Sequence, residues 1–230
     1  MFEVRDQNRA DADKLLIGHD ESGLKQKRDP ETVFSDPKHE LLFNPHTEEY
    51  HELKTFALSD DCLFSRQTYT AKYDEEWMPY NDLTLYSHIL QDRPAIEQHF
   101  APDSAIAQYE SPKKELAHTV IQQIANENGF DAEIFRININ LTQCSKASRS
   151  IVHRDHEFPH WNLLIYLNTW YGGITYVDNE PCPAPQEDMI VTFEGFETMH
   201  WHEPPAGFGD ERIVLVATYM PREIGTITKK

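Results

Sequence analysis

The chain has 230 residues, 39% of them hydrophobic and 26% charged, and a net charge of −18 at pH 7. The length and composition indicate one large globular domain with a substantial core, with or without an N-terminal extension. A surface this negative serves solubility and repels phosphate backbones. It therefore argues against nucleic acid as a partner and favours a basic peptide or protein segment, or a small molecule.

Neither a membrane span nor a secretory signal is evident in the sequence. No apolar run approaches membrane-spanning length, and the acidic start lacks the basic-then-apolar layout of a signal peptide. We therefore expect a cytoplasmic protein without a membrane partner. Cys62, Cys144 and Cys182 are odd in number and far apart, so we expect three reduced thiols and no disulfide framework.

The N-terminal part of the chain is the least regular. Residues 1–40 are charged and polar without a lasting period, which predicts an irregular arm with a short helix around residues 10–17. Residues 41–230 are predicted to form a single domain. Within it, residues 52–73 show strand-like alternation interrupted by turn residues 59–61, and residues 74–82 are interpreted as a surface loop rather than a lid.

Residues 111–129 have the spacing of an amphipathic helix. Pro112 follows Ser111 at a plausible start, and Gly129 is placed to end the helix. The apolar residues Leu116, Val120, Ile121 and Ile124 would form one face. We expect this helix to pack on the outside of the segment that follows.

From Phe130 onwards the pattern changes to short strands separated by Gly, Pro, Asp and Asn. Seven strands are predicted, at residues 133–141, 150–156, 162–168, 173–178, 188–195, 199–204 and 212–220. This number and spacing predict a sandwich or barrel, with its core at about residues 130–222. The fold class is therefore mainly β with flanking helices (α+β).

The segment "SIVHRDHEFPHW", residues 150–161, concentrates groups that bind transition metals. In a strand, residues i and i+2 face the same side, so His153 and Asp155 would point together into the interior. Such a pair is weak evidence alone, because chance supplies about one in a chain with this many His and Asp residues. Downstream, "MHWHEP" supplies His200 and His202 on one face. Two histidines and one carboxylate are the ligand set of non-haem Fe(II) oxygenases.

Arg212 begins the last predicted strand, with Val214, Val216 and Thr218 on its side. An arginine inside a barrel needs an anion, because an unpaired guanidinium is costly to bury. Its fork suits a carboxylate. A metal site with such an arginine downstream predicts binding of Fe(II) and a dicarboxylate.

The ordered motifs "HRD", "LLIYLNTWYGGITYVD", "DMIVTFEG" with a following histidine, and "RIVLVATY" resemble the core of the 2-oxoglutarate/Fe(II)-dependent dioxygenases, in their prolyl-4-hydroxylase-like branch. The resemblance covers residues 134–220. It implies a double-stranded β-helix (jelly roll) and an oxygenase that uses O2, Fe(II) and 2-oxoglutarate, with ascorbate as a candidate reductant. It also implies hydroxylation of a protein or peptide side chain, of prolyl type, or of an amino-acid-like small molecule.

By the same resemblance, His153, Asp155 and a histidine near residue 200 bind iron, while Arg212 and Tyr166 bind the far carboxylate of 2-oxoglutarate. The family's usual stretch, H-x-V-x-P, favours His200 as the distal ligand, because Pro204 follows it four residues later. The number of residues between the distal histidine and Arg212 instead suits His202, which lies ten residues before Arg212 and stays the alternative. His156 is expected on the rim, and His160 at the surface or behind the ligands.

Several other side chains have two readings. Arg136, Asn138 and Asn140 share a strand face that could contact cosubstrate or simply meet solvent. The tyrosine that the family often carries on this strand is not evident. Trp201 is predicted to pack in the core, with a position at a substrate entrance as the alternative. Gly172 or Gly173 is predicted to form a tight turn that needs a positive φ.

Two other functions use the same residues. A non-catalytic, cupin-like metal-binding barrel would need the histidines, and a purely structural jelly roll would make them incidental. Both leave Arg212 without a role beyond a salt bridge, so Arg212 and Tyr166 favour the oxygenase. No substrate-specific motif is evident in the N-terminal half.

Overall fold

The computed structural model describes residues 38–67, 83–94 and 111–223, all within one unit, Asp36–Lys230. The predicted helix around residues 10–17, the arm as far as residue 37 and the segment 74–82 lie outside the described residues. No helix in the described part of the chain is long and apolar enough to cross a membrane.

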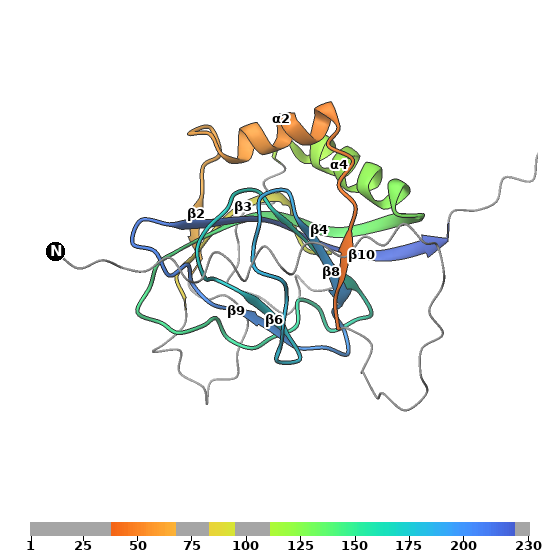
Figure 1. The fold of residues 1–230 in the computed structure, drawn as a ribbon. Coiled ribbons are helices and arrows are strands. Elements are labelled where there is room, and N and C mark those ends of the chain that lie inside the picture. Colours follow the sequence, from red (N-terminus) through yellow and green to blue (C-terminus); the bar gives the residue numbers. More distant parts are fainter. Residues whose placement is uncertain (1–37, 68–82, 95–110, 224–230) are drawn as a thin grey trace, which may run out of the picture. The chain divides into compact units, whose positions relative to one another are not determined.

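The described residues form ten strands and two helices (Figure 1). The helices are α2 (Glu48–Ala57) and α4 (Lys114–Glu127). The strands are β1 (Glu40–Leu42), β2 (Ser65–Gln67), β3 (Leu85–Gln91), β4 (Phe130–Gln143), β5 (Trp161–Tyr166), β6 (Thr175–Val177), β7 (Glu180–Pro181), β8 (Ile190–Glu194), β9 (His200–His202) and β10 (Glu211–Glu223).

The strands pair in two antiparallel sheets. The larger has the order β1-β8-β5-β10-β4-β3-β2, and the smaller has the order β7-β6-β9. Their facing sides enclose an apolar interior made by Leu164, Tyr166, Trp170, Val177, Cys182, Val191, Phe193 and Val214, with Met189 and Val216 packed against it. The predicted fold class, mainly β with flanking helices around a jelly-roll core, is confirmed. Three strands that precede residue 111 also join the larger sheet.

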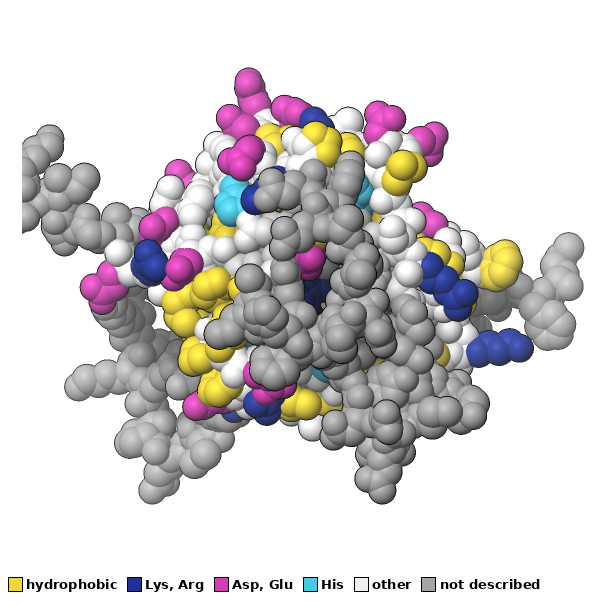
Figure 2. All heavy atoms as spheres, turned by 180° about the vertical axis from the view of Figure 1, so that it is seen from behind, with side chains coloured by type: hydrophobic (Ala, Val, Ile, Leu, Met, Phe, Trp, Pro, Cys, Tyr) yellow, Lys and Arg dark blue, Asp and Glu magenta, His cyan; other side chains and the backbone are white. Residues whose placement is uncertain are grey.

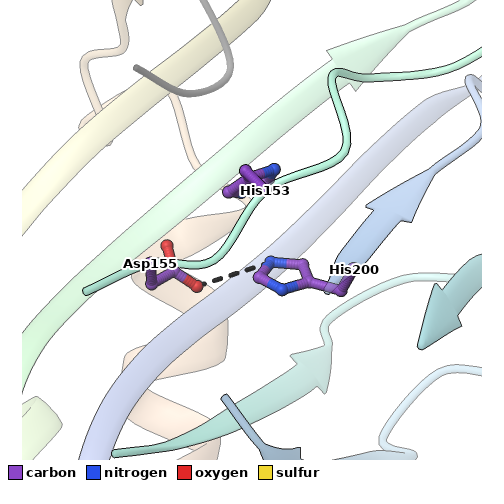
Figure 3. Close-up of side chains that lie close together, drawn as sticks. All are labelled: His153, Asp155 and His200. Atoms are coloured by element: carbon purple, nitrogen blue, oxygen red, sulfur yellow. Dashed lines mark ion pairs between the residues drawn. The ribbon is translucent and has the colours of Figure 1, made fainter. Parts of the chain in front are cut away.

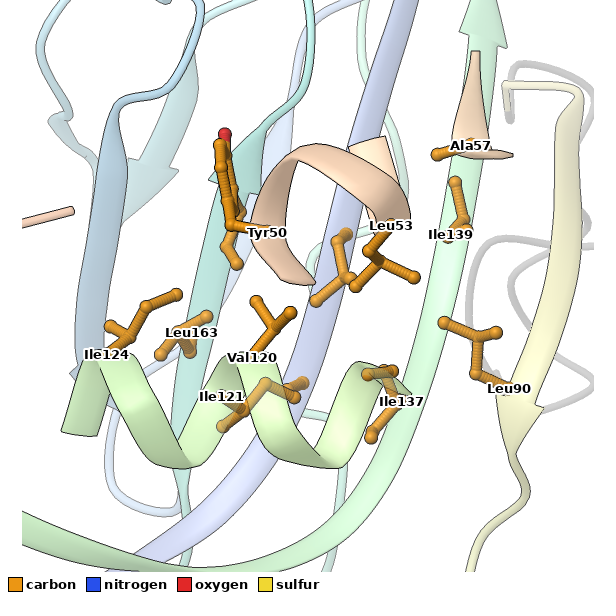
Figure 4. Close-up of a cluster of buried hydrophobic side chains, with 14 of the residues drawn as sticks. Tyr50, Leu53, Ala57, Leu90, Val120, Ile121, Ile124, Ile137, Ile139 and Leu163 are labelled. Carbon is orange, nitrogen blue, oxygen red and sulfur yellow. The ribbon is translucent and has the colours of Figure 1, made fainter. Parts of the chain in front are cut away.

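The two helices cover the outer face of the larger sheet (Figures 1 and 4). Leu53 of α2 and Ile121 of α4 lie in one buried cluster with Ile137, Leu163 and Leu215 of the sheet. Each such side chain contributes about 1.5–3 kcal/mol when it is fully buried. This cluster gives the inner face of the sheet a rigid backing.

Helix α4 confirms the helix predicted at residues 111–129. The residues facing the core are Ala117, Val120, Ile121, Ile124 and Ala125. The helix starts at Lys114, later than predicted, because Ser111 and Pro112 form the preceding turn, in which Lys114 N donates to Ser111 O at 3.0 Å. Gly129 has φ +84°, as a helix-terminating glycine requires.

The strand-like alternation predicted from residue 52 is wrong as far as Ala57, because residues 52–57 belong to helix α2. Thr47 caps the helix, since its side chain accepts from Tyr50 N at 3.2 Å, and two glutamates occupy the first turn. Tyr50, Leu53 and Ala57 are the buried residues. The helical spacing of these three residues, rather than the local strand-like alternation, indicates the secondary structure that forms here. The predicted turn at residues 59–61 is present.

The predicted strand at residues 150–156 is also absent. Only His153 makes a bridge, to His200, and the rest of the segment is irregular. Three backbone hydrogen bonds join the segment to β9: His153 and His200 pair in both directions, at 3.0 and 2.9 Å, and Ser150 N donates to the His202 carbonyl at 2.8 Å. Because the segment does not pair continuously with another strand, the alternation of side chains along a strand cannot explain the orientation of Asp155.

A β-bulge in β4 changes which side chains face inward. The register between β10 and β4 shifts so that Phe135 is the extra residue between Ile134 and Arg136. Ile134 packs with Ile137 against the core under the helices. Phe135 instead packs against Phe158, with ring centroids 5.2 Å apart. Strict alternation, which puts Phe135 on the side of Ile137, is therefore wrong at this position.

Asp188 ties α2 to the sheet. Its carboxylate accepts from Tyr50 Oη and Lys54 Nζ, both at 2.5 Å, and its main-chain carbonyl accepts from Asn44 Nδ2 at 3.1 Å. Burial alone would raise the pKa of Asp188, but the hydrogen bonds from Lys54 and Tyr50 outweigh it and lower that pKa. The ionised carboxylate therefore stabilises the fold.

Asp188→Asn is expected to lower the free energy of unfolding at pH 7 by about 1–2 kcal/mol, because a partly exposed charge-assisted interaction is lost. Asparagine tolerates the positive φ of +68° at this residue. A lowered pKa contributes stability above the unfolded-state value of about 3.9, and that stability is lost as pH falls through the folded-state value. The difference between wild type and variant should therefore shrink below about pH 4. Urea titrations across pH measure it, with the exposed Asp60→Asn as control; a constant difference would contradict this role.

The acidic side chains do not gather in one patch on the face shown in Figure 2, where hydrophobic and basic side chains lie among them.

Candidate metal centre

His153, Asp155 and His200 come together beside the start of β9, whose first residue is His200 (Figure 3). One candidate ligand atom from each lies within 4.8 Å of the other two, and His200 Nε2 is 3.4 Å from Asp155 Oδ2. Asp155 and His200 are each 8% exposed. We call these three residues the His–Asp–His cluster. Among the described residues it is the one group of three or more His, Cys, Asp or Glu that could hold a metal ion.

The imidazoles of the cluster suit a metal. His153 Nδ1 donates to the Ile151 carbonyl at 2.8 Å, so Nε2 is the nitrogen left with a lone pair. Burial, together with the neighbouring His153, lowers the pKa of His200 to about 3, and the ring is neutral at pH 7. His200 Nδ1 is buried without a partner among the described residues. This unpaired nitrogen is not the one nearest Asp155, which is Nε2.

The carboxylate of the cluster is held ionised. Burial alone would raise the pKa of Asp155, but His200 and Arg136 around it outweigh burial and hold that pKa far below its usual range. Arg136 Nη1 donates to Asp155 Oδ1 at 2.9 Å. Two imidazoles and an ionised carboxylate are donors that fit a divalent first-row metal such as Fe(II).

Arg212 is buried, with 3% exposure, at the start of β10. Its Nη2 donates to Thr175 Oγ1 at 3.1 Å, and Tyr166 Oη donates to the same oxygen at 3.2 Å. The ring of Trp170 lies 5.5 Å from the guanidinium, and the buried Cys182 thiol, whose pKa burial raises to about 12, is also close to it. We call these five residues the Arg212 cluster.

No carboxylate of the described residues pairs with Arg212. The ion pairs found in the described ranges do not include it, and its Nε has no hydrogen-bond partner there. Burying an unpaired guanidinium is expensive, so this cation fits an anion supplied from outside the protein. Tyr166 and Thr175 hydroxyls would complete the polar lining for such an anion.

His202 lies between the two clusters. It faces the same side of β9 as His200, its neighbour Thr175 on β6 binds Arg212, and its Nε2 is 3.4 Å from Thr142 Oγ1. Burial, with Arg212 nearby, lowers the pKa of His202 well below its usual value. His202 is not one of the residues whose ligand atoms converge in the His–Asp–His cluster.

Of the other two histidines in the segment 150–161, His156 lies elsewhere than predicted, whereas His160 lies in the second of its two expected places, behind the candidate ligands. His156 was expected on the rim but is 2% exposed, and its Nε2 shares a hydrogen bond of 2.7 Å with Thr218 Oγ1. His160 is 1% exposed, near His200 and away from the surface. Neither belongs to the His–Asp–His cluster. Both face inward because the backbone turns after Asp155 instead of continuing as a strand.

Trp201 and the glycine pair have structural roles. Trp201 points away from the face of His200 and stacks on Tyr176 at 3.9 Å between ring centroids. Gly172 and Gly173 have φ of +71° and +64°, which confirms the predicted turn. A Cβ atom at Gly173 would lie 2.5 Å from Trp170 Nε1, within the Arg212 cluster.

Two contributing residues escaped the sequence reasoning. Thr175 joins Arg212 to Tyr166, and no sequence pattern marks a single threonine for that role. The face that carries Arg136 was predicted to meet either the cosubstrate or solvent, and the contact of Arg136 with Asp155 was not foreseen. Asn140 of the same face accepts from Ser87 Oγ at 2.7 Å and so belongs to the sheet.

No protein-family model matches this chain, and no curated protein is significantly similar in sequence. Three solved structures illustrate its structural similarity. A prolyl hydroxylase from Trichoplax adhaerens, in complex with a peptide of the hypoxia inducible factor oxygen degradation domain, has 13% identity and a TM-score of 0.48, over 80% of this chain and 83% of that one. A 2OG-Fe(II) oxygenase family protein from Burkholderia pseudomallei has 16% identity and a TM-score of 0.48, over 79% and 85%. A Pseudomonas putida prolyl-4-hydroxylase has 18% identity and a TM-score of 0.45, over 79% and 90%. Similarity at this level says nothing about the activity of this chain.

Proposed function

We propose that this protein is an Fe(II)- and 2-oxoglutarate-dependent oxygenase. The observation that carries the proposal is the buried Arg212 without a described carboxylate partner, inside the same barrel as the His–Asp–His cluster. A metal site alone would not need this cation. A ligand that is bound by a metal at one end and by a guanidinium at the other accounts for both.

In this proposal His153, Asp155 and His200 hold the iron, and His202 is not a ligand. Arg212 and Tyr166 hold the far carboxylate of 2-oxoglutarate, with Thr175 orienting both side chains through its hydroxyl. The bound metal and 2-oxoglutarate would supply the oxidising chemistry, in which O2 is consumed and succinate and CO2 are released, with ascorbate as a candidate reductant.

The chain itself supplies binding, orientation and a dry surrounding. Arg212 is rigidly placed, because its strand β10 is paired on both sides, with β4 and β5. The apolar side chains of Leu164, Phe193 and Val214 line the interior and keep water out. Exclusion of water strengthens the attraction between Arg212 and a carboxylate.

We propose hydroxylation as the reaction outcome, on a protein or peptide side chain of prolyl type or on an amino-acid-like small molecule. The negative surface favours a basic segment over nucleic acid as the substrate. Assays should therefore start from basic peptides and free amino acids.

A cupin-like metal-binding barrel without turnover is the second candidate. The His–Asp–His cluster favours it as strongly as it favours the oxygenase. It leaves the buried Arg212 unexplained, and for this reason we rank it second.

The proposal is tested by adding Fe(II) and 2-oxoglutarate to the protein under anaerobic conditions. A visible metal-to-ligand charge-transfer band is expected, because the 2-oxo acid would chelate the iron directly. Succinate release under air, with candidate substrates, follows. Metal binding without this band would overturn the oxygenase and leave the metal-binding barrel.

A further inference from the structure

Asp155 is held by two arginines from different parts of the chain. Arg136 of β4 binds its side chain, and Arg93, which follows β3, donates through Nη1 to its main-chain carbonyl. Asp155 lies in the irregular segment after His153 and belongs to no strand. Its orientation therefore comes from these contacts and not from a β-ladder.

The two oxygens of Asp155 have different surroundings. Oδ1 accepts from Arg136 Nη1 at 2.9 Å, whereas Oδ2 is 3.4 Å from His200 Nε2 and faces the imidazoles. The Arg136 and Asp155 side chains are only 13% and 8% exposed, so solvent does little to screen this pair. One oxygen is thus occupied by the protein, and the other is turned to the ligand site.

The guanidinium of Arg136 is itself fixed. The side-chain amide of Asn138 is oriented so that its nitrogen donates to the Ile137 carbonyl at 2.8 Å. In this orientation the amide oxygen accepts from Arg136 Nη2 at 2.6 Å and from Arg136 Nε at 2.9 Å. Burial lowers the pKa of Arg136 to about 10, so it stays charged at pH 7. The bulge at Phe135 sets the register that brings Arg136 to this position.

We propose that Arg136 is a positioning residue that limits Asp155 to one oxygen toward the metal. A carboxylate can bind a metal through one oxygen or both. Engaging Oδ1 would keep Asp155 from taking a second position, so the metal would retain the open positions needed by a chelating 2-oxo acid and O2. This inference rests on the proposed function.

Because Arg136 is charged, a positioning role and a purely structural role predict different changes in metal affinity when it is removed. A cation beside Asp155 weakens the carboxylate as a donor, so its removal should leave metal affinity unchanged or higher. A merely structural arginine would instead support the cluster, and its loss would weaken metal binding.

The first test uses Mn(II)-loaded protein and the relaxation of water protons, which reports the number of exchangeable waters on the metal. In Arg136→Met the relaxation enhancement should fall by roughly a third, as one of three open positions is lost to a chelating Asp155. Arg136→Lys, which can still donate to Oδ1, should restore much of it, and the exposed Arg222→Met should match wild type. Equal enhancement in wild type and Arg136→Met would refute the proposal, and it would do so whether or not 2-oxoglutarate binds.

The second test titrates 2-oxoglutarate into the anaerobic Fe(II) forms. Arg136→Met should bind it at least about 10-fold more weakly, because a chelating Asp155 would compete for one of the open metal positions that the 2-oxo acid needs. Metal affinity should not fall. If Arg136→Met does not fold, Asn138→Ala, which keeps Arg136 but frees its guanidinium, should show a smaller loss of the same kind. A missing band in wild type would sink the proposed function, whereas weaker metal binding with unchanged 2-oxoglutarate affinity would sink only the role of Arg136.

Discussion

Replacing His200 by alanine is expected to lower the affinity for a divalent metal by more than about 100-fold, whereas replacing His202 should leave it nearly unchanged. Loss of a supporting contact costs about 10- to 100-fold, and loss of a ligand should cost more. The two histidines lie on one face of the same strand, but only His200 has a ring nitrogen close to Asp155, at 3.4 Å from Oδ2. Calorimetry with Co(II) or Mn(II) under anaerobic conditions measures both affinities.

The pair of variants carries its own control. His202→Ala removes a partly buried imidazole from the same strand, so a general loss of packing would appear in both proteins. His202→Ala is still expected to weaken 2-oxoglutarate binding, because it faces the space between the His–Asp–His cluster and Arg212. The opposite result, metal lost with His202→Ala and kept with His200→Ala, would identify His202 as the distal ligand.

Arg212→Met should weaken 2-oxoglutarate binding by at least about 30-fold and leave the metal in place. Removing one partner of a buried charge pair costs about 2–5 kcal/mol. The ligand-free variant should be as stable as wild type or more stable, because methionine replaces a cation that has no carboxylate partner in the described part of the chain. Titration of the charge-transfer band and thermal melts of the ligand-free protein measure the two effects.

Substitution of a functional arginine is expected to lower 2-oxoglutarate affinity without lowering the stability of the ligand-free protein. Substitution of a structural arginine is expected to lower that stability. Arg222→Met on the same strand is the control, because the side chain of Arg222 is 59% exposed and pairs with Glu133. It should change neither quantity. A large loss of stability in Arg212→Met would show that Arg212 serves the fold, as the metal-binding barrel without turnover requires.

Local patterns predicted the elements whose determinants are close in the sequence. Helix α4 has its apolar spacing and its terminal glycine within the same 20 or so residues. The strands β4, β5, β8 and β10 have strong apolar alternation or continuous apolar runs, which identified them. Helix α2 was missed because its capping threonine and its three buried positions were outweighed by a short alternating stretch.

The candidate site shows a different limit. The residue types and their order predicted that His153 and Asp155 would lie together with either His200 or His202, and the candidate ligand atoms of His153, Asp155 and His200 do converge. The reason given for the first two was wrong, since no strand forms at residues 150–156. Backbone pairing of His153 with His200, and the two arginines that hold Asp155, produce the arrangement instead.

The sequence by itself determined the mainly β architecture, the placement of helix α4 outside it and the set of candidate residues for binding a metal and a carboxylate. These depend on periodicity and on side-chain chemistry, which are local properties of a chain. The tertiary structure alone decided that His200 rather than His202 approaches Asp155, that Thr175 joins Tyr166 to Arg212, and that Arg136 engages one oxygen of Asp155. Each of these contacts joins residues distant in the chain, and a bulge or an irregular segment that shifts the backbone by one residue decides which side chain meets which.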